Sequence, residues 1–422
     1  MVVEHPTRII DGQVTLPTSK SISNRLQIIK SLCKHQFDIH GLSDAEDTSV
    51  LSNLLRHESQ TYNAGLAGTT ARFLLARLCL LPGTQILTGE PGLKQRPIAP
   101  LVDALKSMGA SVRYLESPGK LPVEIGDPPD IFAKRVVIDS SLSSQFISAL
   151  LLIAPSLPDG LRITLQGKPS SRPYIEMTLR IMRQFGIQSF WSKNTISVGP
   201  GEYIPPQGVF VEPDWSAAAF FYEITALAEK SEIEFPGLSA LSVQGDNKAI
   251  DLFQPLGVST KLTDSGVIIK KILGGTSNQI TVDFADCPDL AQPVLTTAAV
   301  LGIPGFFKGL HTLRVKETDR IEALRQEFQK FGIKLESFTA ANNPGMKRKG
   351  ESGLRPSATA RLFGHPQLLE LTEFATWGDH RMAMCLAPLG LMKPIRINAP
   401  EVVTKSFPGY WKELRRLGFT CK

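Results

Sequence analysis

The chain has 422 residues, too many for one ordinary domain, so we expect two large lobes. Its hydrophobic content of 42% and charged content of 20% are typical of a soluble globular protein, and no apolar run is long enough to span a membrane. The net charge of +6 comes without a dense basic tract interleaved with aromatic residues. This argues against nucleic-acid binding and favours a cleft for small anions.

The cysteines and the N-terminal residues indicate a cytoplasmic protein. Cys33, Cys79, Cys287, Cys385 and Cys421 are scattered without paired spacing, which predicts reduced thiols and argues against a zinc site. The first ten residues lack the apolar stretch of a signal peptide. We therefore expect a cytoplasmic location.

Two kinds of predicted helix alternate along the chain. The first kind opens with small or polar residues and then becomes almost wholly apolar, which predicts burial on nearly all sides. Its six members are residues 21–33, 69–81, 144–154, 216–227, 289–301 and 380–391. The second kind is amphipathic, and its six members are residues 47–56, 98–108, 174–185, 247–256, 319–331 and 409–417.

A glycine follows five of the six amphipathic helices, at the position where a left-handed residue commonly ends a helix. These glycines are Gly109, Gly186, Gly257, Gly332 and Gly418. Extended stretches are expected at 111–115, 187–191, 258–262, 267–272, 279–284 and 333–337. The order strand, helix, strand, helix, strands thus recurs six times, which predicts compact packing and not an open solenoid. The basic segment 342–355 is expected to be a mobile surface loop without a chemical role.

The most unusual stretch is residues 314–320, Arg-Val-Lys-Glu-Thr-Asp-Arg, with three cations and two carboxylates. Asp319 and Glu322 form a predicted capping pair, which puts Arg320 in the first turn of the following helix. A cation there opposes the helix dipole, so local stability does not explain it. An anion bound at the helix start would explain it, and a solvated surface cluster is the alternative.

Other segments also place cations and hydroxyl groups beside the apolar helices, as an anion site requires. They are residues 17–25, 67–72, 89–97, 143–145 with 170–174, 377–384 and 404–408. Each alone is compatible with an ordinary capped helix or a solvated turn. Together they predict a site for multiply anionic substrates, with Asp289 and Glu317 available for proton transfer.

The motifs at 20–25, 89–97, 143–145, 314–320 and 379–384 occur in the same order in the 5-enolpyruvylshikimate-3-phosphate synthase family, which the chain therefore resembles. The likeness runs from about residue 16 to the last helix. It implies an α/β (α+β) fold of two lobes, each with three βαβαββ-like repeats around buried helices. One lobe would comprise residues 1–17 and 213–422 and the other residues 18–212, with hinges near 17–18 and 211–214.

The reaction implied by this resemblance is transfer of the enolpyruvyl group from phosphoenolpyruvate to the 5-hydroxyl of shikimate 3-phosphate. Phosphate is released through a tetrahedral addition–elimination intermediate, on the way to chorismate and the aromatic amino acids. The resemblance implies no metal and no organic cofactor. The expected partners are the two small substrates, without nucleic acid or membrane, and we expect a monomer.

The resemblance also implies residue roles. Asp289 would accept the proton of the substrate hydroxyl, Glu317 would protonate the methylene carbon, and Lys20 would touch both substrates. Expected shikimate 3-phosphate contacts are Lys20, Ser21, Arg25, Ser143, Ser144, Gln145, Ser171, Asp289, Thr312 and Lys316. Expected phosphoenolpyruvate contacts are Lys20, Gly68, Arg96, Gln145, Arg320, Arg381 and Lys405.

The chain departs from the family pattern at three of these motifs. Leu66 stands where an asparagine is common, which removes one expected phosphoenolpyruvate contact. Thr312 also replaces an asparagine, although its hydroxyl can still donate to a phosphate, and Gly378 replaces another. These departures bear on efficiency more than on the type of reaction.

Two other functions are compatible with parts of this pattern. A non-catalytic anion-binding homologue would not favour extra carboxylates in its pocket, so the retained Asp289 and Glu317 argue against it. A UDP-N-acetylglucosamine enolpyruvyl transferase is expected to carry a cysteine in the loop at 89–97, which has none here.

Overall fold

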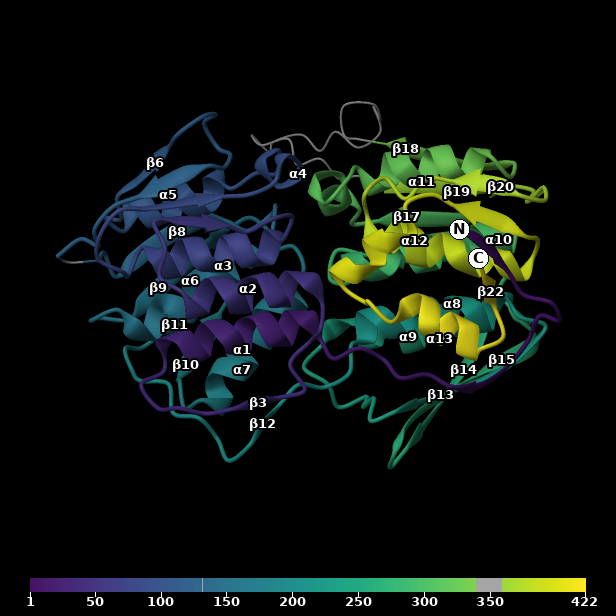
Figure 1. Cartoon of the computed structure of the whole chain (residues 1–422), viewed down its shortest axis with the longest axis horizontal. Coiled ribbons are helices and arrows are strands. Elements are labelled where there is room, and N and C mark those ends of the chain that lie inside the picture. The colour runs from purple at the N-terminus through teal and green to yellow at the C-terminus, as the bar shows by residue number, and fades with distance from the viewer. Residues whose placement is uncertain (131, 339–358) are drawn as a thin grey trace. The chain divides into compact units, whose positions relative to one another are not determined.

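The computed structural model describes residues 1–130, 132–338 and 359–422, so the predicted loop at 342–355 lies outside the described residues. The chain divides into two compact units (Figure 1). The discontinuous unit comprises Met1–Pro17 and Pro213–Lys422, and the continuous unit comprises Thr18–Glu212. Within the described residues, no helix is both long and apolar enough to cross a membrane.

The continuous unit contains seven α-helices among its described residues. Its elements are α1 (Lys20–Leu32), β3 (Ile39–His40), α2 (Glu46–Arg56), β4 (Thr61–Asn63), α3 (Gly68–Leu78), β5 (Gln85–Thr88), α4 (Pro91–Lys94), α5 (Ala99–Ser107), β6 (Val112–Tyr114), β7 (Val123–Ile125), β8 (Arg135–Asp139), α6 (Ser144–Ile153), β9 (Leu161–Gln166), α7 (Arg172–Gln184), β10 (Ser189–Ser192), β11 (Thr195–Val198) and β12 (Val209–Phe210). A 3-10 turn, η1 (Ala154–Ser156), extends α6.

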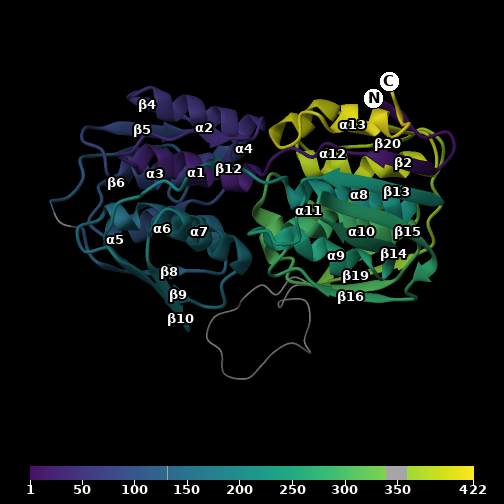
Figure 2. The same cartoon turned by 90° about the horizontal axis from the view of Figure 1, so that it is seen from below.

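The discontinuous unit begins with two N-terminal strands and resumes at α8. Its elements are β1 (Val2–Glu4), β2 (Ile9–Gln13), α8 (Trp215–Leu227), β13 (Lys230–Pro236), η2 (Gly245–Lys248), α9 (Ala249–Phe253), β14 (Leu256–Thr263), β15 (Gly266–Thr276), β16 (Ile280–Asp283), η3 (Pro288–Leu290), α10 (Ala291–Val300), β17 (Gly305–Lys308), η4 (His311–Val315), α11 (Arg320–Gln329), β18 (Ile333–Phe338), β19 (Thr359–Gly364), β20 (Thr372–Phe374), α12 (His380–Leu386), η6 (Ala387–Leu391), β21 (Ile395–Ile397), η7 (Pro400–Lys405), α13 (Tyr410–Arg416) and β22 (Thr420–Cys421). Figure 2 shows α12, α8 and α10 stacked through the middle of this unit.

Five four-stranded sheets have the same topology. In the order β16-β17-β19-β18, the first two strands are parallel and the last two form an antiparallel hairpin. The sheets β4-β5-β7-β6, β8-β9-β11-β10 and β2-β13-β15-β14 follow the same order. This is the strand order that a βαβαββ repeat produces. In β20-β21-β1-β22 the pairing directions are the same, but the last two strands come from opposite ends of the chain and form no hairpin.

The sixth sheet is shorter than the repeat predicts, with only β3 and β12 paired in parallel among the described residues. Only residues 57–60 separate α2 from β4, which already belongs to the next sheet. The chain therefore has no room after α2 for the hairpin that completes the other repeats.

The apolar helices are buried, as predicted. In α6 every residue except Gln145 is buried, and in α8 every residue except Ser216. Both exceptions are polar residues in the first turn. The core thus surrounds these helices and leaves their N-terminal ends available for polar contacts.

The predicted helix ends are mostly confirmed. All five predicted glycines have positive φ, and at Gly332 a Cβ would lie 2.8 Å from the carbonyl oxygen of His365. The predicted end of the helix at 247–256 is wrong, because α9 ends at Phe253 and Gly257 lies within β14. Asp319 caps α11 by accepting from the backbone N–H groups of Ile321 and Glu322, as expected. The reciprocal half of the capping pair is wrong, because the Glu322 carboxylate instead accepts from Arg325 at 2.8 Å.

One carboxylate interrupts the apolar surface of α8. Glu223 is 0% exposed, and within the part of the chain that the structure describes neither of its carboxylate oxygens has a hydrogen-bond partner. Burial raises the pKa of Glu223 well above its ordinary value. Such an acid lowers folding stability once the pH rises above its unfolded-state pKa of about 4.3.

We expect Glu223→Leu to raise the free energy of unfolding by roughly 1–3 kcal/mol near neutral pH, because it removes an unsatisfied buried polar group. Urea unfolding would measure the gain, which should shrink below about pH 4, where the wild-type acid is protonated in both states. Glu229→Leu is the control, since Glu229 is largely exposed beside Arg8. An unchanged unfolding midpoint for Glu223→Leu would contradict the prediction.

Candidate functional site

Arg320 is the centre of a buried charge cluster in the discontinuous unit. Its side chain is 2% exposed, and its guanidinium contacts three carboxylates. Nε lies 2.7 Å from Asp379, one Nη lies 3.2 Å from Asp289, and the other lies 2.9 Å from Glu317. For Arg320, the alternative of a solvated surface cluster is therefore wrong.

Three helix starts bring these carboxylates together. Asp289 lies in η3, immediately before α10, and Glu317 lies between η4 and α11. Asp379 caps α12, where it accepts from the backbone N–H of Arg381 at 2.8 Å. Burial alone would lower the pKa of Arg320, but the three carboxylates outweigh it and raise that pKa. The guanidinium consequently stays charged.

Three further predicted cations join the cluster. Arg381 contacts Asp289 twice, at 3.0 Å from the Asp289 carboxylate and at 3.1 Å from its backbone oxygen. The Lys316 ammonium lies 3.9 Å from the Asp289 carboxylate. The Lys405 ammonium lies 3.3 Å from Glu317. The structure thus gathers all the predicted site residues of residues 289–405 except Thr312 into one ion-pair network.

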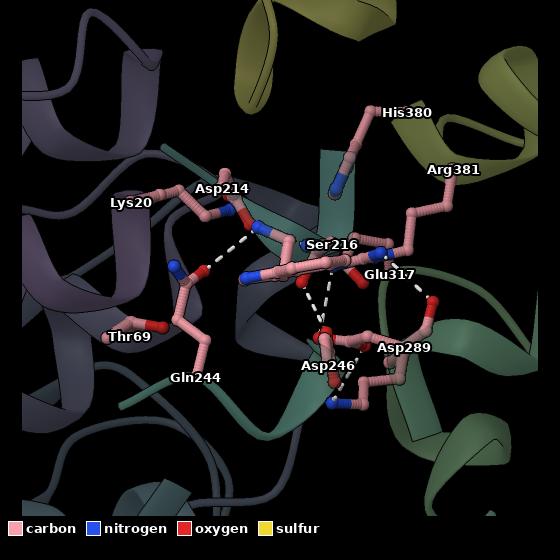
Figure 3. Close-up of polar contacts among 12 residues, drawn as sticks. Lys20, Thr69, Asp214, Ser216, Gln244, Asp246, Asp289, Glu317, His380 and Arg381 are labelled. Carbon is pink, nitrogen blue, oxygen red and sulfur yellow. Dashed lines mark hydrogen bonds and ion pairs between the residues drawn. The ribbon is translucent and has the colours of Figure 1, made fainter. Parts of the chain in front are cut away.

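The electrostatics of Asp289 follow from these contacts. Burial by itself would raise the pKa of Asp289, but Arg381, Lys316 and Arg320 outweigh it, and the pKa is lowered. Its side chain keeps 16% exposure. Figure 3 shows Asp289, Glu317 and Arg381 converging from their separate segments. Asp289 is therefore an ionised carboxylate within reach of solvent.

Two polar residues beside this network carry additional information. Thr312 is 4% exposed in η4, and its hydroxyl oxygen has no hydrogen-bond partner among the described residues. A buried hydroxyl without a partner suits a bound acceptor such as a phosphate. His380 is 2% exposed, and its Nδ1 lies 3.8 Å from the Asp379 carboxylate.

In the continuous unit, the starts of α1 and α2 lie together. Lys20 is the first residue of α1, and its ammonium lies 2.9 Å from the Asp47 carboxylate. Asp47 is 5% exposed and was not among the predicted site residues. An acidic residue in the first turn of a helix is an ordinary sequence feature, so only the ion pair distinguishes Asp47 from a capping group.

Arg25 lies deeper in the same unit, with 2% exposure. It donates to the Thr178 hydroxyl at 2.7 Å, the Ser148 hydroxyl at 3.2 Å and the backbone oxygen of Ser21 at 2.8 Å. Burial lowers the pKa of Arg25 to about 10. The guanidinium supports the first turn of α1, and the expected contact with shikimate 3-phosphate stays a prediction.

The starts of α3 and α6 form a second polar group in the continuous unit. A Cβ added to Gly68 would lie 2.5 Å from a guanidinium nitrogen of Arg72 and 2.6 Å from one of Arg96, so only glycine admits both. The Gln145 amide donates to the Thr69 hydroxyl at 3.0 Å. Gly68 and Gln145 thus lie at neighbouring helix starts, and Arg96 reaches Gly68 from the segment between α4 and α5.

The predicted serines also lie at helix starts. Ser143 caps α6 by accepting from the backbone N–H of Gln145 at 3.2 Å, and Ser144 is buried beside it. Ser171 precedes α7 with a left-handed φ of 55°. The neighbouring Ser170 has a buried hydroxyl oxygen for which residues 1–130, 132–338 and 359–422 supply no hydrogen-bond partner.

A family model and curated relatives match this chain over most of its length. The model of EPSP synthase (3-phosphoshikimate 1-carboxyvinyltransferase) matches residues 52–414. A 3-phosphoshikimate 1-carboxyvinyltransferase from Bacteroides fragilis (strain YCH46) is 40% identical over 417 residues, covering 98% of this chain and 97% of the relative. One from Vibrio campbellii is 34% identical over 445 residues, covering 98% of each.

Solved structures share the fold. EPSP synthase from Acinetobacter baumannii superposes with a TM-score of 0.75 at 20% identity, covering 100% of this chain and 99% of that one. The enolpyruvyl transferase NikO from Streptomyces tendae gives a TM-score of 0.71 at 14% identity, covering 99% and 97%. The expected fold class is thereby confirmed. From the matched family model and the full-length relatives, the chain belongs to the EPSP synthase (3-phosphoshikimate 1-carboxyvinyltransferase) family.

Proposed function

We propose that the protein transfers the enolpyruvyl group of phosphoenolpyruvate to the 5-hydroxyl of shikimate 3-phosphate and releases phosphate. Family membership supports this reaction, which leads towards chorismate and the aromatic amino acids. The observation that carries the assignment of roles is the shared cation Arg320. Its guanidinium nitrogens lie 3.2 Å from the Asp289 carboxylate and 2.9 Å from the Glu317 carboxylate, so both proposed proton-transfer groups contact one guanidinium.

Two proton transfers are needed in this reaction. The attacking hydroxyl must lose a proton, and the methylene carbon must gain one, before phosphate leaves the tetrahedral intermediate. Asp289 is ionised and partly exposed, which suits a proton acceptor. Glu317 is the proposed donor to carbon. Neither transfer requires a metal or an organic cofactor.

The cations have a second effect on Glu317. Arg320 and Lys405 both pair with its carboxylate, which favours the ionised form. An anionic substrate bound by the same cations would offset their charge. Glu317 would then hold a proton more readily, so substrate binding itself would prepare the donor.

The remaining site residues are proposed as substrate contacts. In the discontinuous unit, Lys316 and Thr312 would hold shikimate 3-phosphate, and Arg320, Arg381 and Lys405 would hold phosphoenolpyruvate. In the continuous unit, Lys20 and Gln145 would touch both substrates. The other proposed contacts there are Ser21, Arg25, Ser143, Ser144 and Ser171 for shikimate 3-phosphate, and Gly68 and Arg96 for phosphoenolpyruvate. The hinge expected near 17–18 and 211–214 is part of the same proposal.

We also propose a cytoplasmic monomer that acts on these small molecules without nucleic acid or membrane. All five cysteines are free thiols, which supports a reducing compartment. The two alternative functions are not favoured, because the family model and the curated relatives agree on one activity.

The proposed function is tested by phosphate release from phosphoenolpyruvate, measured with and without shikimate 3-phosphate. We expect release only when both substrates are present. Calorimetric binding of shikimate 3-phosphate without release would instead identify a non-catalytic homologue. If the protein shows no binding of shikimate 3-phosphate and no phosphate release, the assignment is contradicted altogether.

A further inference from the structure

The proposed proton acceptor lies in an environment that weakens it as a base. Arg320 and Arg381 lie 3.2 Å and 3.0 Å from its carboxylate, and Lys316 lies 3.9 Å away. A carboxylate whose pKa is held far below its ordinary range accepts a proton poorly, because proton transfer follows the basicity of the acceptor. A neighbouring negative charge would restore basicity to Asp289.

Asp246 is positioned to supply that charge. It lies in η2, is 2% exposed, and accepts a hydrogen bond from the Ser216 hydroxyl in the first turn of α8. Figure 3 shows its carboxylate between Ser216 and Asp289. None of the roles proposed above uses this carboxylate.

The position of Asp246 is fixed by its own neighbour. The Gln244 side-chain oxygen accepts from the backbone N–H of Trp215 at 3.1 Å, and its amide nitrogen donates to the backbone oxygen of Pro213 at 2.7 Å. Asp214 accepts from the backbone N–H of Ser216 at 2.8 Å and so caps α8. The turn that carries Asp246 is therefore tied directly to the start of a buried helix.

Asp246 titrates in the range where the enzyme would work. Burial raises its pKa to about 6, helped by the charges of Asp289 and Asp214 and opposed by the Ser216 hydrogen bond and Arg381. The other titratable and charged groups around its turn are Cys287 before η3, Lys248 within η2, and Asp286, which lies 3.9 Å from Lys248. Asp246 is therefore mostly ionised near neutral pH and neutral in mild acid.

We infer that Asp246 is a positioning residue whose buried negative charge, held by Ser216, opposes the cations around Asp289 and keeps Asp289 basic enough to take the substrate proton. This inference rests on the proposed role of Asp289. It gives Asp246 no contact with substrate. Asp246 acts only through the charge that it places beside Asp289.

Asp246→Asn tests this role, because it keeps the size and removes the charge. At about pH 8, with both substrates saturating, we expect turnover to fall roughly ten-fold. The wild-type enzyme should lose turnover as the pH falls through about 6, where Asp246 becomes neutral. The variant should lack that step, so the two pH profiles should converge in acid. Substrate ionisation is common to both enzymes and cancels in the comparison.

Ser216→Ala should move the acid-side fall, whereas Asp246→Asn should abolish it. Losing the hydroxyl donor raises the pKa of Asp246, so the acid-side fall in turnover should move up by roughly 0.5–1 pH unit. A merely structural role would move thermal stability without moving either profile. The inference would be overturned if the variants changed thermal stability alone. It would also be overturned if Asp246→Asn still lost turnover near pH 6 as the wild type does.

Asp289→Asn separates this inference from the proposed function. If Asp289→Asn remains fully active, Asp289 is not the proton acceptor, and the proposed role fails together with the inference. If Asp289→Asn is inactive and the Asp246→Asn profile keeps the wild-type shape, only the inference about Asp246 fails. Loss of activity in Asp289→Asn with the expected change in Asp246→Asn supports both.

Discussion

Arg320→Met should lower the free energy of unfolding by roughly 3–5 kcal/mol at about pH 7 and reduce turnover by at least about 100-fold. Methionine fills much of the same space but leaves Asp289, Glu317 and Asp379 buried without their shared cation. Urea unfolding measures the first effect, and phosphate release measures the second. Asp289 keeps Arg381 and Lys316, and Glu317 keeps Lys405, so the loss falls mainly on the buried carboxylate of Asp379. A buried carboxylate without its cation takes up a proton, so the stability deficit should shrink as the pH falls towards about 4.

The control for this experiment lies on the same helix. Arg325→Met removes an arginine from α11 that pairs with Glu322 at the surface, and its unfolding midpoint should hardly change. Asp379→Asn is a milder second variant, because Arg320 then keeps two carboxylates. An Arg320→Met protein that unfolds like the wild type at neutral pH would show that the cluster is not held by this guanidinium.

Glu317→Gln should lower turnover by about 10²–10⁴-fold while both substrates still bind. Glutamine keeps the shape of the side chain but has no carboxyl proton to deliver to carbon. Because the substitution removes a negative charge beside Arg320 and Lys405, phosphoenolpyruvate should bind at least as tightly as before. Turnover at saturation and calorimetric binding measure the two effects separately.

Glu322→Gln is the matched control for this second prediction. Glu322 lies in the first turn of α11, and its carboxylate contacts Arg325 and Gln326 at the surface. Its turnover should equal that of the wild type. Near-full turnover of Glu317→Gln with both substrates saturating would show that another group protonates the methylene carbon.

The sequence predicts the repeated architecture well because each repeat has patterns that can be recognised within a short stretch of sequence. The apolar helices, the glycines with positive φ and the short strands are all near-neighbour patterns, and Gly332 and Gly418 end helices where expected. The missing hairpin after α2 was not predicted. The hairpin is missing because only residues 57–60 lie between α2 and β4, and no residue type in the sequence marks where β4 begins.

Within the site, sequence patterns identify charged residues better than their partners. Arg320 and Arg381 stand in unusual charge runs, whereas Asp47 and Asp246 each look like ordinary residues near a helix start. Their importance comes from pairing across distant segments, Lys20 with Asp47 and Ser216 with Asp246. The sequence-based view of residues 314–320 also allowed solvation, and only burial at 2% exposure excludes it for Arg320.

The discontinuous unit has a consequence for synthesis. Strand β1 pairs Val3 with Ile395 of β21 on one side and with Cys421 of β22 on the other. Strand β1 is made first, but its sheet cannot close until Cys421 of β22 has left the ribosome. The continuous unit has all its strands available once Phe210 has emerged. During translation, strand β1 stays unpaired until β21 and β22 have been made, whereas β2 can pair with β13 as soon as Glu234 has emerged. The edge of β1 is therefore the one that chaperones would have to protect in this interval.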